Sequence, residues 1–165
     1  MPNRREPLTN EMVHYIQDKG KTLEKQGLKD NLYLSMSNWL TLGMQGGFRI
    51  SEWAQTNVPP TQLHTFNTNV DGTAKAFRTD DLIFFSKGKK LINTTNSLSR
   101  LKHSKLVNLR WRFQKNLDNG QQMTYTSDPN PNLCFVQAAI TIRRRVVRAK
   151  LESTTPIAVF LQHDV

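Results

Sequence analysis

The chain has 165 residues, 37% of them hydrophobic and 22% charged, which suits one globular domain with its own core and excludes a disordered tail. Its one cysteine, Cys134, excludes an internal disulfide and a cysteine-based zinc site, and it favours a reducing, intracellular compartment. No apolar run reaches the roughly 18 residues that span a bilayer, so no membrane contact is expected. Residues 1–7 lack the apolar segment of a signal peptide.

Positive charge is concentrated in the middle of the chain. Lys and Arg number 23 against 13 Asp and Glu, a net charge of +10. Residues 71–150 hold 16 basic and 5 acidic side chains, whereas residues 1–70 hold 7 and 6. Such a concentrated field favours a polyanionic partner, of which nucleic acid is the commonest. The alternative is a basic surface with no partner.

Capping residues and glycines delimit the first helices. Thr9 or Asn10 can cap a first helix, which we expect to end near Gly27. A second helix is predicted over residues 30–47, ending at paired glycines; it is apolar on most sides and therefore buried and central. A short helix is expected to follow over residues 48–54.

Strand patterns begin after a polar stretch. Residues 81–85 read as a strand, and residues 107–113 alternate between an apolar face and a polar, basic face. Asn119-Gly120 predicts a hairpin, whose returning strand is expected to turn Met123 and Tyr125 inward.

A last helix is predicted over residues 132–150. Its buried side is expected to hold six apolar residues, and its solvent side four arginines: Phe135, Val136, Ala139, Ile140, Val146 and Val147 against Arg143, Arg144, Arg145 and Arg148. The fold class is therefore α+β, mostly helical with a small antiparallel sheet. The helical part covers about residues 8–57 and the sheet about 80–126.

Two cations are candidates for phosphate chemistry. Arg49 follows Gly46-Gly47 at the joint between two predicted helices, and a guanidinium stays charged and clamps two phosphate oxygens. Glu52 lies on the same helical face and can orient it. Lys115 enters the predicted hairpin loop, where an amine can protonate a leaving oxygen. On spacing alone, an ordinary helix-start ion pair and a solvated turn lysine are the more common explanations.

Residues 42–54, LGMQGGFRISEWA, resemble the first arginine box of the tyrosine recombinase (phage integrase) family. Residues 112–120 and the returning strand resemble its lysine-bearing β-hairpin, and residues 132–139 the helix after it. These segments resemble recombinases carried by eukaryotic mobile elements more than bacterial ones.

The resemblance implies DNA strand breakage and rejoining through a phosphotyrosyl link, with Arg49 and Lys115 catalytic and Glu52 in support. It implies neither metal nor nucleotide cofactor. Double-stranded DNA is the expected partner, and the residues expected to contact it are Arg110, Arg112, Lys102 and Lys105.

The family's His-x-x-Arg box and nucleophilic tyrosine have no counterpart in these 165 residues. We therefore expect residues 1–165 to be the first half of a catalytic domain, a monomer that cannot cleave DNA alone, whereas the complete enzyme would act as a tetramer. The expected location is intracellular and DNA-associated, in the nucleus if the source is eukaryotic and in the cytoplasm or nucleoid if it is prokaryotic or a phage. Two alternatives remain. One is a non-catalytic basic nucleic-acid-binding domain or recombinase relic, and the other is an interaction domain with an incidental basic face.

Overall fold

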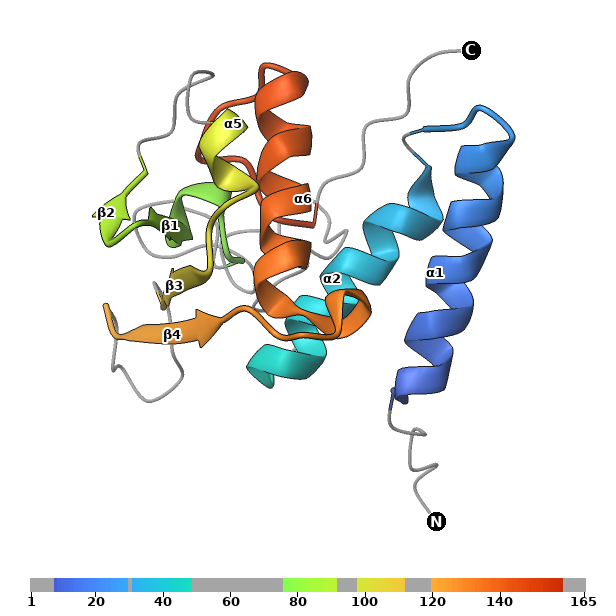
Figure 1. Ribbon diagram of the computed structural model, residues 1–165, viewed down its shortest axis with the longest axis horizontal. Coiled ribbons are helices and arrows are strands. Elements are labelled where there is room, and N and C mark those ends of the chain that lie inside the picture. The colour runs from blue at the N-terminus through green and yellow to red at the C-terminus, as the bar shows by residue number, and fades with distance from the viewer. Residues whose placement is uncertain (1–7, 30, 49–75, 92–97, 112–119, 159–165) are drawn as a thin grey trace, which may run out of the picture.

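The computed structural model describes residues 8–29, 31–48, 76–91, 98–111 and 120–158, and the account that follows is confined to them. Within these residues the fold is α+β, as predicted (Figure 1). The helices are α1 (Asn10–Lys25), α2 (Leu32–Gly46), α5 (Leu98–Leu101) and α6 (Phe135–Arg148). The strands are β1 (Leu82–Ser86), β2 (Lys89–Lys90), β3 (Leu106–Arg110) and β4 (Gln122–Thr126), with 3₁₀ turns at Thr79–Asp81 and Pro131–Leu133.

Helix α1 begins as predicted, with Thr9 as its cap. The Thr9 side chain accepts a hydrogen bond from the backbone N–H of Met12 at 3.3 Å. Gly20 is buried in the middle of the helix, and a Cβ atom placed there would lie 2.8 Å from the backbone nitrogen and side chain of Leu34. This glycine therefore permits the close approach of α1 to α2.

Helix α2 packs between α1 and α6. Its cap is Asn31, whose side chain accepts from the N–H of Leu34 at 3.0 Å, while the predicted first residue, Asp30, lies outside the described residues. Gly47 ends the helix in the left-handed conformation with φ 64°, as the glycine pair predicted. Of the predicted short helix over 48–54, only Phe48 is described; its ring lies 4.8 Å from that of Phe77.

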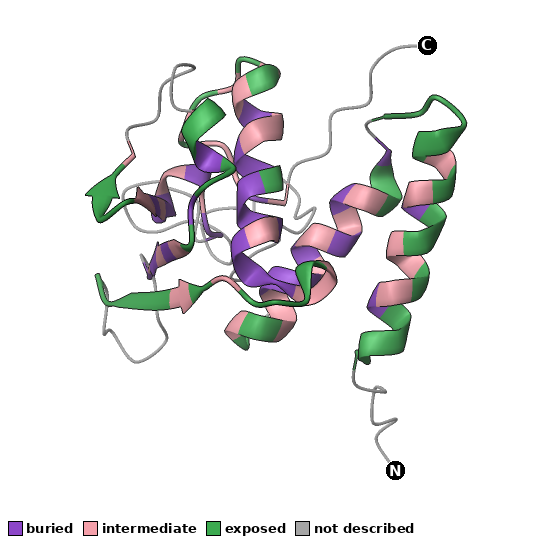
Figure 2. Ribbon diagram, in the orientation of Figure 1, coloured by how far each residue is buried: buried purple, intermediate pink, exposed green. Residues whose placement is uncertain are grey.

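The four strands form one antiparallel sheet in the order β2-β1-β3-β4. Leu82 pairs with Leu109 and Val107 with Tyr125, so the apolar side chains of neighbouring strands share one face. Helix α6 covers this face, and Figure 2 shows buried residues along α6, in β1 and β3 and in part of α2, while β2, β4 and much of α1 are exposed. The fully buried core includes Leu42, Leu82, Phe84, Val107, Leu109, Val136 and Ile142.

Two predictions about facing direction are wrong. Arg143, expected on the wet side of the last helix, is only 4% exposed and donates from Nη2 to the Leu82 carbonyl at 3.0 Å. Met123, expected inside, is 45% exposed. It lies on an edge strand, and the aromatic cover from α6, Phe135, stacks instead on Tyr125, with ring centroids 3.7 Å apart.

Candidate nucleic-acid interface

Arg49, Glu52, Lys115 and Arg112 lie outside the described residues. The mutual geometry of the predicted catalytic pair is therefore not part of what the structure describes. Three predicted DNA-binding residues are described, namely Lys102, Lys105 and Arg110, and the interface is built from these.

Lys102 and Lys105 are exposed on the turn that joins α5 to β3. The turn is fixed to the core by Leu101, which is 3% exposed. The N–H of Ser104 donates to the Leu101 carbonyl at 2.9 Å, and the Lys105 carbonyl accepts from the N–H of Ser127 at 2.9 Å. The two lysines thus project into solvent from a well-held backbone, a suitable arrangement for contacts to phosphates.

Arg110 forms an ion pair with a buried carboxylate. Its Nε donates to Oδ1 of Asp81 at 3.2 Å, and the Asp81 side chain is completely buried. The other oxygen of that carboxylate accepts from the backbone N–H of Arg78 at 2.9 Å. Arg110 therefore neutralises a buried charge, while 38% of its side chain stays exposed.

The structure separates Arg110 from the two lysines. Lys105 immediately precedes β3 and Arg110 ends it, and five residues of strand span about 16 Å. The pairing of Phe85 with Leu106 brings the end of β1 next to the start of β3. The lysines at 102 and 105 therefore share their end of the sheet with the β1–β2 hairpin rather than with Arg110.

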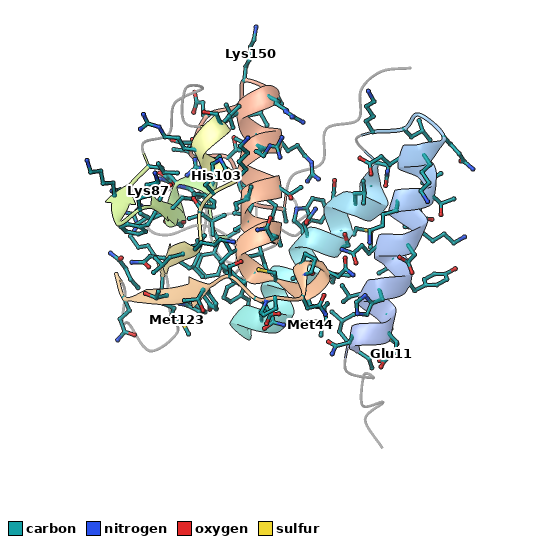
Figure 3. All side chains as sticks on the ribbon, in the orientation of Figure 1. Glu11, Met44, Lys87, His103, Met123 and Lys150 are labelled. Atoms are coloured by element: carbon teal, nitrogen blue, oxygen red, sulfur yellow. The ribbon has the colours of Figure 1, made fainter. Side chains whose placement is uncertain are left out.

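The hairpin adds lysines that the sequence reasoning treated only as turn residues. Lys87 and Gly88 adopt φ 50° and 74° at its tip, and Lys87 projects away from the sheet in Figure 3. We call four of the exposed lysines at this end the basic edge: Lys87, Lys89, Lys102 and Lys105. Their signal in the sequence was the Ser-Lys-Gly-Lys turn between two strand patterns.

Two carboxylates near the basic edge are already paired. Among the described residues from 76 to 111, the acidic side chains are Asp80 and Asp81. Arg78 Nη2 lies 2.9 Å from Oδ2 of Asp80, and Arg110 pairs with Asp81. The two aspartates thus have arginine partners, and the four exposed lysines favour a polyanionic partner, with one exposed carboxylate, Asp128, following Ser127 at the Lys105 end of the sheet.

Two other kinds of site are absent from the part of the chain that the structure describes. It contains no group of three or more His, Cys, Asp or Glu side chains that could hold a metal ion. Nor does it contain a helix both long and apolar enough to cross a membrane. In comparisons with protein-family models, curated proteins and solved structures, none matched this chain.

Proposed function

We propose that this chain binds double-stranded DNA as part of a DNA breaking and rejoining enzyme of the tyrosine recombinase type. The observation that carries the binding is the basic edge, whose four lysines are exposed at one end of the sheet. The enzymatic part rests on the arginine box around Arg49 and the hairpin lysine Lys115.

Lysines of this kind contact the phosphate backbone as point charges and carry little sequence information. Each phosphate neutralised releases counterions, so affinity falls as salt rises. Four such contacts predict a loss of about 100-fold between about 50 mM and 200 mM salt. Binding should also vary little between duplexes of different sequence.

Fluorescence anisotropy with a short labelled duplex tests the binding. Replacing Lys87, Lys102 and Lys105 by glutamine should reduce the slope of log affinity against log salt by about 3. The matched control removes three exposed lysines on or just after α1, Lys19, Lys25 and Lys29, and should leave the slope nearly unchanged. Equal effects of the two triple variants would refute an interface at the basic edge.

Arg49 separates the recombinase from a non-catalytic DNA-binding domain. In the recombinase it clamps one phosphodiester, so Arg49→Ala should weaken duplex binding, and Arg49→Lys should restore the charge but not the bidentate contact. If both variants bind like the unmodified chain while the basic-edge variant does not, the non-catalytic domain is the better description. No covalent adduct with a nicked suicide duplex is expected from these 165 residues.

A further inference from the structure

A pocket of about 400 Å³ lies beside β1, and neither Lys102 nor Lys105 lines it. Three cations from different elements line it: Lys90 of β2, Arg110 of β3 and Arg143 of α6. The volume falls within the range of small-molecule sites. Cations that converge from separate elements on one pocket favour an anionic ligand.

The buried cation of this pocket has an unsatisfied donor. Arg143 is 4% exposed, and its Nη2 donates to the Leu82 carbonyl at 3.0 Å. Its guanidinium lies over the Phe84 ring at 5.6 Å, but its buried Nε has no hydrogen-bond partner in the described structure. Burial lowers the pKa of Arg143 to about 10, and nearby Asp80 opposes the shift only in part. An oxyanion in the pocket would supply a compensating charge for this buried cation.

One carboxylate lines the pocket, but it is already engaged. Asp80 accepts from Arg78 through both oxygens, at 3.2 Å from Nε and 2.9 Å from Nη2. Such a bidentate contact, with two parallel hydrogen bonds from one guanidinium to one carboxylate, is a strong form of the arginine–carboxylate ion pair. The pocket therefore keeps a net positive charge.

We propose that this pocket binds a phosphate group, held by Lys90, Arg110 and Arg143. A phosphate offers acceptor oxygens in several directions, which suits donors that approach from three elements. The apolar side chains of Leu82, Ile83 and Leu91 line the rest of the pocket and leave room for the group that carries the phosphate. That group is either a DNA strand or a small phosphorylated molecule, so the inference stands without the proposed function.

Inorganic phosphate is the probe, titrated at constant ionic strength and followed by two-dimensional ¹H–¹⁵N NMR. Saturable shifts are expected at the Arg143 Nε–H signal and the amides of β1. Lys90→Gln should weaken phosphate binding at least 5-fold. Lys89→Gln is the matched control, because Lys89 is the neighbouring exposed residue of β2 and does not line the pocket; it should change the affinity less than 2-fold.

Neither substitution lies in the core, so both variants should fold. Absence of saturation, or equal weakening by the two substitutions, would overturn the proposal, because it would indicate general attraction to surface lysines. Saturating phosphate is then added to duplex-binding assays. Competition in the unmodified chain, but not in Lys90→Gln, assigns the phosphate to DNA. Saturable binding without competition assigns it to a small phosphorylated molecule, whatever becomes of the recombinase proposal.

Discussion

The ion pair between Arg110 and Asp81 should be strongly asymmetric in its response to mutation. The Asp81 side chain is fully buried, whereas 38% of the Arg110 side chain is exposed. Arg110→Gln removes the cation that donates to Oδ1 of the buried Asp81 carboxylate. Asp81→Asn leaves a guanidinium that can turn to solvent and keeps an oxygen able to accept from the N–H of Arg78, 2.9 Å away.

The magnitudes follow from burial. Breaking a buried pair costs about 3–5 kcal/mol when the charge left behind stays buried, and the exposure of Arg110 reduces this to about 2–3 kcal/mol. Asp81→Asn should cost about 1 kcal/mol, the value of a charge-assisted hydrogen bond weakened to a neutral one. In the double variant most of the Arg110→Gln cost should disappear, because the buried carboxylate at position 81 is gone.

Urea denaturation of the four proteins measures these free energies of unfolding as a double-mutant cycle. Equal costs for the two single variants would refute the reasoning, as would simple additivity in the double variant. Either result would mean that the carboxylate is hydrated or satisfied without Arg110. The assignment of a structural task to Arg110 would then fail.

Three further predictions concern single positions. Gly20→Ala should lower the free energy of unfolding by about 1–2 kcal/mol, because a Cβ 2.8 Å from the Leu34 backbone outweighs the gain of about 1 kcal/mol in helix propensity; a more stable variant in thermal melts would contradict the close approach. Arg143→Ala should cost about 2–4 kcal/mol and exposed Arg148→Ala under about 0.5 kcal/mol in the same assay, and equal costs would put Arg143 back on the solvent side. Burial raises the pKa of Tyr125 above its ordinary 10.0, so the folded state keeps the phenol proton to higher pH than the unfolded state, and the free energy of unfolding falls as pH rises through 10. Tyr125→Phe should remove this contribution to the pH dependence of the free energy of unfolding, measured by urea denaturation across that range.

Local signals predicted the element ends well, because these depend on a few neighbouring atoms. The Thr9 cap and the glycine stop after α2 are each decided within one helical turn. The strand β3 and its two faces were also predictable, since Val107 and Leu109 alternate with Asn108 and Arg110.

Facing directions of single side chains were predicted less well. Arg143 follows Val136 by seven residues and Ala139 by four, so helical spacing alone places it on the apolar stripe of the helix. The charge of an arginine side chain favours the solvent side, and here the position in the helix outweighs that preference. The prediction that Met123 faces inward was wrong for a different reason. Its alternation is correct, but whether a neighbouring helix reaches that point of an edge strand depends on tertiary packing that no local pattern encodes.

Arg110 connects the buried ion pair with the proposed phosphate pocket, and this gives a prediction that neither feature makes alone. Asp81 draws on the same guanidinium that would hold the phosphate. Removing its charge by Asp81→Asn should release Arg110 toward the ligand and lessen the repulsion of an anion, so phosphate affinity should rise about 3- to 10-fold, or roughly 1 kcal/mol. The same substitution destabilises the fold, so a merely damaged pocket would bind more weakly. Phosphate titrations by calorimetry at a temperature where both proteins are folded measure this change in affinity, and unchanged or weaker binding would contradict the prediction.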